Sequence, residues 1–450
     1  MKKGLSVTLL SVVAVLTAVL AFFTFVRFSV GINRYNSILG AVNTDYDLSG
    51  GTAYTLTLAD DNLEEVADVN EVVNTLKTRL TSLGYQTFSV KALSDAGLDE
   101  HADYDIRIEL RGNINEYGEV DTSVLASDVA VAAAYGEIKF YGGTSANPTE
   151  EILTEGKAVK SAAYKGVYAT VSGGSAYRVD IEFSDYGYKT LSELMGESSY
   201  YLKITLGDTV LMSGDGAISK ASFDGKAISI TTSTENYARQ AALQIESGGL
   251  AYKYDISEGE EVSSPYGKNL GTASVIGILA IVVIFVAYAF VEYRGYGCAY
   301  ALSTILFALL YIAMLVAVPG VKVAVGGVFG VIAALILTVF GTEKVGSSIK
   351  AEYAKGKTVK SAVKAGFDGA LAPVLVSCAV ALFASLLLLV FAVGTLKSFA
   401  AVLAIGSVLS AVTTLILHRA FSSLLLSATG YKEGFMNLKR QDGASAETEE

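Results

Sequence analysis

The chain has 450 residues, of which 52% are hydrophobic, with a formal net charge of −11 and a mean hydropathy of +0.45. This composition is too apolar for an ordinary soluble protein and too charged for a bundle of membrane helices alone, so we expect a mixed architecture. Two cysteines, both in apolar segments, exclude a disulfide framework, and two histidines argue against a histidine-based metal site.

Six stretches are long and apolar enough to span a bilayer. They cover residues 5–26, 270–291, 297–318, 323–341, 371–394 and 399–427. The first is long for the core of a signal peptide, so an uncleaved anchor is favoured over a cleaved signal. In the fourth, Gly326 and Gly330 offer a small-x-x-x-small face for close helix packing.

Basic residues predict how these spans are oriented. Lysines precede the first span, six more lie in the expected loop at residues 342–370, and others follow the last span. All of them are cytoplasmic if both termini are cytoplasmic. The predicted domains are an N-terminal transmembrane anchor at residues 1–33, an extracytoplasmic α+β domain at 34–268, a five-helix transmembrane domain at 269–430 and an acidic cytoplasmic tail at 431–450.

Residues 34–268 contain 36 Asp and Glu against 18 Lys and Arg. Such an acidic domain argues against binding nucleic acid or anionic lipid heads. We interpret the charge as a solubility feature rather than as a cation or substrate site.

The first part of this domain alternates strands with a helix. Residues 45–51, DYDLSGG, predict a tight turn before an alternating strand over residues 54–58. Apolar residues then recur at helical spacing over residues 62–83, and Gly84 is the expected C-cap. Strands are expected at residues 87–92 and 104–110, whereas residues 113–176 stay largely unassigned.

A second copy of this pattern follows. Its predicted elements are a strand at residues 177–183, a helix at 186–196, strands at 201–206, 209–213 and 227–232, a helix at 235–247 and a strand at 250–254. Ser233 or Thr234 is the expected N-cap of the second helix. The two copies predict an α+β domain with two ferredoxin-like halves. Since no nucleophile–base pair, phosphate loop or metal-ligand spacing is present, we predict no catalytic, cofactor-binding or metal-binding residue and no enzymatic activity.

Several short motifs resemble, in order, those of the SecD family, a subunit of the bacterial Sec protein-export machinery in the resistance–nodulation–division superfamily. The motifs are D-L-x-G-G at residues 47–51, L-x-x-R-x-x-x-x-G at 76–84, a loose D-G-x-V-x-S at 207–213, S-G-x-L at 247–250, a cytoplasmic-loop pattern at 356–370 and a shortened V-G-T-G-x-x-K-G-F-A at 393–400. The structural motif residues are Asp47, Gly50, Gly51, Gly248 and Gly249. The resemblance covers nearly the whole chain and implies one N-terminal span, a large outer domain and five further spans.

The sequence differs from the pattern of the SecD family at positions that concern energy coupling. The family's fourth span carries V-D-A-N, with a carboxylate tied to proton-driven work, and its Asp and Asn positions fall on Phe340 and Thr342 here. The D-x-N-x-T-T of the fifth span falls on residues 376–381, which are also without a charge. A charge at membrane depth is costly and usually functional, so its loss suggests that the coupling is lost too. Glu343 is the nearest acid, and we interpret it as an interfacial partner of Lys344 or Lys350 rather than as a relay.

The resemblance implies a SecD-like accessory subunit of the cell membrane that assists protein export. Its implied partners are a SecF-like subunit, the Sec channel subunits and the unfolded exported polypeptide held by the outer domain, with no cofactor and no nucleic acid. Two alternatives stay open: a small-molecule efflux protein of the resistance–nodulation–division type, and a membrane-anchored sensing or interaction protein.

Overall fold

The computed structural model describes residues 3–31, 33–59, 69–93, 105–114, 119–135, 138–145, 147–153, 158–169, 175–194, 200–206, 209–212, 217–218, 226–232, 234–247, 250, 252–430 and 433–438. The chain divides into two compact units. The membrane unit comprises Met1–Gly51, Asn113–Asp121 and Ser263–Glu450, and the α+β unit comprises Thr52–Gly112 and Thr122–Val262. Residues 34–51, 113–114, 119–121 and 263–268, which the sequence assigns to the outer domain, therefore group with the membrane helices.

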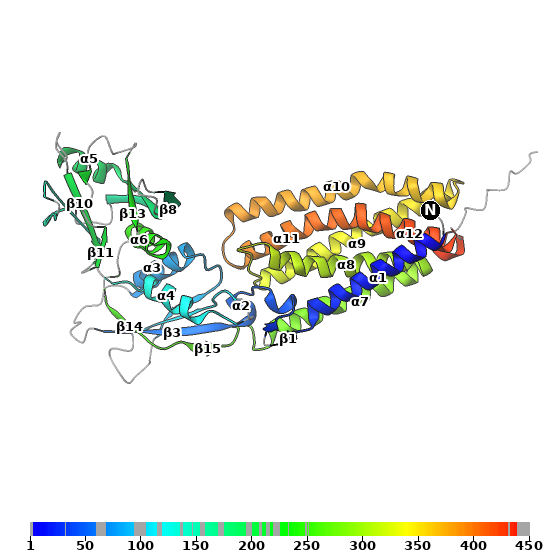
Figure 1. The fold of residues 1–450 in the computed structure, drawn as a ribbon, viewed down its shortest axis with the longest axis horizontal. Helices are drawn as coiled ribbons and strands as arrows, with labels where there is room; N and C mark the ends of the chain where they lie inside the picture. Colours follow the sequence, from blue (N-terminus) through cyan, green and yellow to red (C-terminus); the bar gives the residue numbers. More distant parts are fainter. Residues whose placement is uncertain are drawn as a thin grey trace, which may run out of the picture. The chain divides into compact units, whose positions relative to one another are not determined.

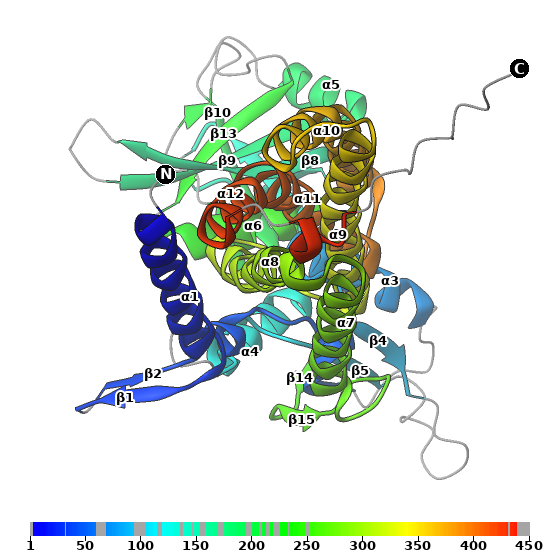
Figure 2. The ribbon, with the colours of Figure 1, turned by 90° about the vertical axis from the view of Figure 1, so that its right-hand side faces the viewer.

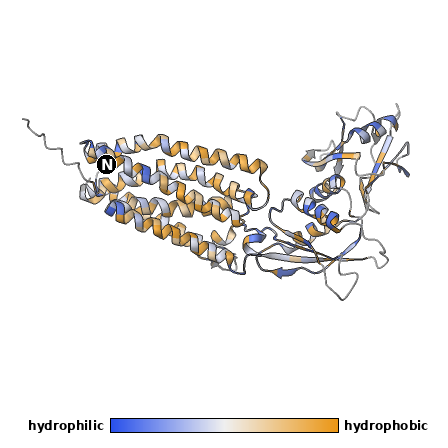
Figure 3. Ribbon diagram, turned by 180° about the vertical axis from the view of Figure 1, so that it is seen from behind, coloured by the Kyte–Doolittle hydropathy of each residue, from blue (hydrophilic) through white to orange (hydrophobic). Residues whose placement is uncertain are grey.

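Long apolar helices build the membrane unit (Figures 1 and 3). They are α1 (Lys3–Phe25), α7 (Leu270–Tyr293), α8 (Gly297–Ala317), α9 (Val325–Ala354), α10 (Val359–Phe391), α11 (Thr395–Val412) and α12 (His418–Thr429). In the described part of the chain, five helical segments are long and apolar enough to cross a membrane, with Leu270–Ala317 as one of them. Within that segment a 3-10 turn, η5 (Arg294–Tyr296), separates α7 from α8, and Arg294 has a φ of 51°.

The expected loop at residues 342–370 is mostly helical, which corrects our interpretation of its lysines as loop residues. α9 continues to Ala354 and α10 begins at Val359, so only residues 355–358 connect the two helices. Apolar side chains recur at helical spacing through both extensions and are buried in one cluster: Val345, Ile349, Tyr353, Val359, Val363 and Phe367. Lys344, Lys360 and Lys364 are exposed on the other faces, so these extensions are amphipathic.

Two further features shape the helical bundle. A Cβ atom at Gly326 would lie 2.1 Å from the Thr395 backbone oxygen, and one at Gly330 2.9 Å from that of Phe399, so the predicted close packing of small residues is confirmed between α9 and α11. The last helical segment contains a π-helical turn, η6 (Thr413–Leu417), directly before α12. Such turns are frequent at functional sites.

Short elements complete the membrane unit. They are strands β1 (Phe28–Val30) and β2 (Asn33–Tyr35), the 3-10 turns η1 (Leu39–Ala41) and η7 (Glu433–Met436), and the helical turn α2 (Tyr46–Ser49). The predicted tight turn at residues 45–51 is thus one turn of helix ended by Gly50. Figure 2 shows α1 at one side of the bundle, where it packs against α8 and α12.

The first half of the α+β unit forms one antiparallel sheet. Its strands are β3 (Gly51–Leu58), β4 (Ser89–Ala92), β5 (Ile106–Leu110), β14 (Tyr254–Ile256) and β15 (Glu260–Val262), in the order β14-β3-β5-β4, with β15 also beside β3. Helices α3 (Val69–Ser82) and α4 (Thr122–Ala132) share a buried cluster with alternate residues of this sheet, including Ile106, Ile108 and Leu110.

The strands of the second half divide between two sheets. One contains β6 (Ile138–Gly143), β7 (Glu150–Leu153), β10 (Tyr200–Leu206), β11 (Thr209–Met212) and β12 (Ala217–Ile218), and the other β8 (Val159–Ala169), β9 (Ser175–Phe183) and β13 (Ala227–Thr232). Helices α5 (Asp185–Leu194) and α6 (Glu235–Ser247) accompany them. An α+β architecture is therefore observed, but two ferredoxin-like halves are not confirmed.

Most predicted elements of the α+β unit are present within a few residues. β13 and α6 have the predicted bounds, Thr234 Oγ1 accepts the Tyr237 N–H at 3.3 Å as an N-cap, and Gly84 with a φ of 96° ends α3. The predicted strand at residues 250–254 is wrong, because Leu250 forms an isolated bridge with Tyr135 and β14 begins only at Tyr254. Residues 62–68 of the first predicted helix lie outside the described residues.

Candidate functional site

The segment after the first span is joined by backbone hydrogen bonds to the residues that precede α9. The Val323 N–H donates to the Asn43 carbonyl oxygen at 2.7 Å, and the Asp45 N–H donates to the Val323 carbonyl oxygen at 3.0 Å. Asp45 also caps α2, with its Oδ1 accepting the Tyr46 N–H at 2.9 Å. This arrangement positions Asp47, in the middle of α2, beside the start of α9.

The first N–H groups of α9 are capped by side chains from other segments. The N-cap residue itself, Ala324, has no side chain that could accept a hydrogen bond. The three bonds are Ala324 N–H to Ser398 Oγ at 2.9 Å, Val325 N–H to Asp47 Oδ2 at 3.1 Å, and Gly326 N–H to Thr395 Oγ1 at 2.6 Å. The N–H groups of a first turn have no partner within their own helix, and a negative charge is favoured at this end. Asp47, which is 7% exposed, therefore ties the segment after α1 to α9.

The motif glycines have unequal roles. Gly50 ends α2 with φ 74° and ψ −169°, a region that only glycine occupies readily. Gly51 has no positive φ and begins β3. Gly248 and Gly249 lie outside the described residues.

Glu343 takes part in an aromatic network rather than in the expected ion pair. Its Oε1 accepts a hydrogen bond from the Tyr293 hydroxyl at 2.9 Å. Lys344 lies over the Phe340 ring, 5.3 Å from its centroid, and Lys350 pairs with Glu292 instead. The structure places Glu343, half-buried, near the end of the bundle where α9 extends towards α10.

This network continues inward through Tyr293 at the end of α7, Tyr296 of η5 and Tyr300 of α8. Tyr293 and Tyr300 stack with ring centroids 4.5 Å apart, and the Tyr300 hydroxyl donates to the Thr342 carbonyl oxygen at 3.1 Å. Next to them, the Tyr296 hydroxyl donates to Ser422 Oγ at 2.7 Å. Polar side chains thus cross-link η5 to α12 and α8 to α9, as interhelical hydrogen bonds do in membranes.

His418 lies at the inner end of this network and is fully buried. Its ring is 4.6 Å from Tyr300 and 5.7 Å from Phe367, measured between centroids. Its Nδ1 is 3.0 Å from Ser303 Oγ, while Nε2 has no hydrogen-bond partner among the described residues. His418 is the first residue of α12, immediately after the π-helical turn.

The hydrogen bonds of Ser303 indicate the tautomer of His418. Ser303 Oγ donates its one proton to the Ala299 carbonyl oxygen at 2.6 Å. The contact with His418 therefore requires Nδ1–H as the donor, which leaves Nε2 as an unprotonated acceptor. Chemically, this imidazole can take up a proton or accept a hydrogen bond from a water molecule at Nε2.

Sequence reasoning missed His418 because only Asp, Glu, Lys and Arg were sought at membrane depth. Histidine is also an expensive residue inside a membrane and usually marks a functional position. A histidine within the span predicted at residues 399–427 was the available signal. The positions that correspond to the family's intramembrane acids show the opposite character, since Phe340 and Val376 are exposed apolar residues, whereas Thr342 and Cys378 are buried.

In the α+β unit, the buried charge of Arg79 connects two of the quoted motifs. Arg79 of α3 donates from Nε to Ser247 Oγ at 2.9 Å and from Nη1 to the carbonyl oxygens of Ala132 and Ala134 at 2.7 and 3.1 Å. Burial lowers the pKa of Arg79 to about 10. Among the described residues, no group of three or more His, Cys, Asp and Glu could hold a metal ion.

The apolar spans together with the α+β unit show which class of protein this is: a multi-pass membrane protein. Among curated proteins, the chain is similar to the protein translocase subunits SecD of Acidaminococcus fermentans (24% identity over 423 residues, 92% of this chain and 91% of that protein) and Rickettsia conorii (29% over 245 residues, 54% and 46%). It also resembles SecD of Escherichia coli K12 (24% over 198 residues), but the match covers only 32% of that protein. No model of a known protein family matches.

Among solved structures, the chain is similar to a crystal structure of SecDF in a super-membrane-facing form. The TM-score is 0.74 at 19% identity, over 95% of this chain and 58% of that one. At this identity the likeness concerns the fold. The resemblance to SecD seen in the motifs is confirmed by these relatives, and the findings fit a membrane protein with an extracytoplasmic α+β domain.

Proposed function

We propose that this chain is a SecD-like accessory subunit that assists protein export through the Sec channel and has no catalytic activity of its own. One observation carries the proposal: the match to the SecD of Acidaminococcus fermentans spans about nine-tenths of both chains. The fold similarity to SecDF over 95% of this chain supports it independently. The efflux alternative is not favoured, because the curated relatives are SecD proteins and the expected spans contain no acid at mid-depth.

The proposed topology has six spans with both termini in the cytoplasm. α7 and α8 have 24 and 21 residues, and about 20 residues suffice to cross the hydrocarbon core, so each counts as a span. Residues 34–268 then lie outside, between the anchor at 1–33 and the spans within 269–430, with the α+β unit as the outer domain and a cytoplasmic tail at 431–450. In this position the domain holds the emerging polypeptide and hinders its return.

We further propose that the first half of the α+β unit is ferredoxin-like. β3, α3, β4, β5, α4 and β14 follow one another as strand-helix-strand-strand-helix-strand, and the strand order β14-β3-β5-β4 is antiparallel throughout. The second region is then an insertion between α4 and β14. Its division into two sheets does not support an equivalent second half.

The proposed partners are a SecF-like subunit and the Sec channel. The names of the curated relatives, protein translocase subunits SecD, and the fold similarity to a SecDF structure support these partners. Coupling to a proton gradient is proposed to reside outside this chain, because no Asp, Glu, Lys or Arg lies at mid-depth in the expected spans and His418 is accompanied in its network only by tyrosines and hydroxyl groups among the described residues.

Affinity purification in mild detergent tests the proposal. A tagged chain should recover Sec channel subunits and a SecF-like protein, whereas an unrelated tagged multi-pass protein expressed at the same level should not. Depletion of the chain should also slow the processing of exported precursors. Recovery of no Sec subunit together with unchanged precursor processing would overturn the proposed function.

A further inference from the structure

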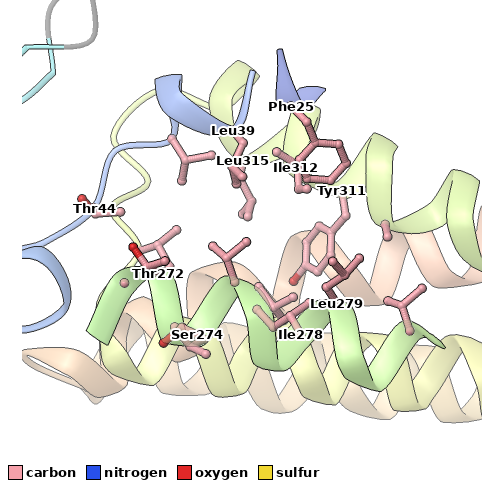
Figure 4. Close-up of a pocket in the computed structure, with 18 of the residues that line it drawn as sticks. Phe25, Leu39, Thr44, Thr272, Ser274, Ile278, Leu279, Tyr311, Ile312 and Leu315 are labelled. Atoms are coloured by element: carbon pink, nitrogen blue, oxygen red, sulfur yellow. The ribbon is translucent and has the colours of Figure 1, made fainter. Parts of the chain in front are cut away.

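The membrane unit contains a cavity of about 820 Å³ beside α7 (Figure 4). Its wall is formed mainly by aliphatic side chains of α7, α8 and α9, such as Ile278, Leu279, Ile312 and Leu315. Tyr311 contributes its ring. The volume is in the range of small-molecule sites.

This cavity opens sideways at the surface of the spans. Several of its lining residues are exposed, among them Phe25 at 49%, Leu279 at 53% and Val283 at 60%. Within a bilayer such an opening faces lipid chains rather than water. An apolar occupant is therefore expected.

Positively charged and polar residues also line the cavity. Arg27 follows α1 and Lys268 precedes α7, and both line the cavity together with the hydroxyl groups of Thr44, Ser49 and Thr272. In the described part of the chain no acid lines the cavity, so the acidic charge of residues 34–268 does not extend to this site, and Arg27 and Lys268 form no ion pair with any described residue. Two uncompensated cations in an apolar groove complement an occupant with a negative head and a hydrocarbon tail.

We propose that this groove is a binding site for an anionic phospholipid. The acyl chain lies along α7 and α8, and the phosphate is held by Arg27 and Lys268 at the end where α1 finishes and α7 begins. A transmembrane helix of a partner fits the groove less well, since a cylinder about 10 Å wide and 30 Å long occupies roughly 2,400 Å³. The site does not depend on the proposed role in protein export.

The absence of tryptophan from the chain allows a direct test. A Leu279→Trp variant introduces one fluorophore that points into the groove. After reconstitution in phosphatidylcholine, brominated phosphatidylglycerol should quench it at a several-fold lower mole fraction than brominated phosphatidylcholine. In the control variant Ile284→Trp, on the same helix but outside the groove and 63% exposed, both lipids should quench equally.

Charge variants identify the headgroup contacts. Adding Arg27→Ala and Lys268→Ala to Leu279→Trp should remove the preference for phosphatidylglycerol, whereas Lys397→Ala, an exposed lysine outside the groove, should preserve it. Equal quenching by both lipids in Leu279→Trp, or a preference that survives the double alanine variant, would overturn the proposal. Quenching of Ile284→Trp but not of Leu279→Trp by either lipid would also overturn it, since the groove would then be closed to lipid.

Discussion

Arg79 Nε donates a hydrogen bond to Ser247 Oγ at 2.9 Å, although 168 residues separate them in the chain. The Ser247 hydroxyl in turn donates a hydrogen bond to the Leu243 carbonyl oxygen at 2.7 Å, so the serine joins Arg79 of α3 to the backbone of α6. Arg79 belongs to the motif at residues 76–84 and Ser247 to the motif at residues 247–250. The buried guanidinium of Arg79 therefore connects these two motifs in the folded chain.

Replacing Arg79 by alanine should destabilise the α+β unit by about 3 kcal/mol, because two buried carbonyl oxygens and a hydroxyl lose their donor. Arg107→Ala, which removes a surface pair with Glu109 at 31% side-chain exposure, should cost less than about 1 kcal/mol. Pulse proteolysis of the full chain in detergent compares the two. Equal losses would contradict the buried role of Arg79.

The pH dependence of this contribution follows from the pKa of Arg79. Burial lowers that pKa from 12.5 to about 10, so the native state loses its proton before the unfolded state does. The free energy of unfolding should rise with pH only from about pH 10 upward. Between pH 6 and 9 the difference in stability between the wild type and Arg79→Met should be constant, as measured by denaturant titration. A change within that interval would show that another titrating group is coupled to Arg79.

Asp47 caps the start of α9, so its loss should affect the thermal stability of the membrane unit. Asp47→Ala should cost about 1 kcal/mol, while Asp47→Asn, which retains an acceptor oxygen, should cost less. Asp255→Ala, at an exposed position of β14, is the control. Thermal unfolding of the full chain in detergent measures the order wild type, Asp47→Asn, Asp47→Ala. If Asp47→Asn is as unstable as Asp47→Ala, the charge matters and the hydrogen bond does not.

Gly50 has a backbone conformation that side chains avoid, so Gly50→Ala should destabilise the chain by roughly 1–3 kcal/mol. Gly277→Ala, in the middle of α7 with nothing within 4 Å of an added Cβ, should be neutral or stabilising. Melting temperatures of both variants test this expectation. An unchanged melting curve for Gly50→Ala would show that the backbone conformation of Gly50 does not contribute to stability.

The chain reconstituted alone in liposomes under a pH gradient should pass protons no faster than empty vesicles, because the expected spans contain no acid at mid-depth and His418 alone cannot form a relay. Glu343→Gln should also leave export support largely intact. A pH-sensitive dye inside the vesicles reports the flux. A current abolished by Glu343→Gln or by His418→Gln would identify that residue as a relay.

The orientation of the spans can be tested with single cysteines in a background without Cys298 and Cys378. An impermeant thiol reagent added to intact cells should label Lys189→Cys, whose native side chain is 78% exposed, but not Lys355→Cys, at 67% in the link between α9 and α10. Both variants should react after the membrane is permeabilised. Labelling of Lys355→Cys from outside would reverse the proposed topology.

The sequence by itself determined the features that depend on local periodicity. Uninterrupted apolar runs located the spans, because a bilayer demands about 20 such residues. Helical spacing and a capping threonine defined α6, and glycine at a left-handed position ended α3. The lysines of residues 342–370 misled the interpretation, because an amphipathic helix shows many charges while it buries its other face.

Only the tertiary structure decided which distant residues meet. The Asp47 carboxylate accepts a hydrogen bond from the backbone N–H of Val325, 278 residues away. A backbone donor of this kind cannot be predicted from a pattern of side chains. The surroundings of His418 could not be predicted from the sequence either. Its burial, its hydrogen bond with Ser303 and the lack of a described hydrogen-bond partner at Nε2 arise from the packing of α8 against α12. Hydrogen bonds form wherever packing brings a donor to an acceptor and excludes water, and that is a property of the assembled bundle rather than of any one segment.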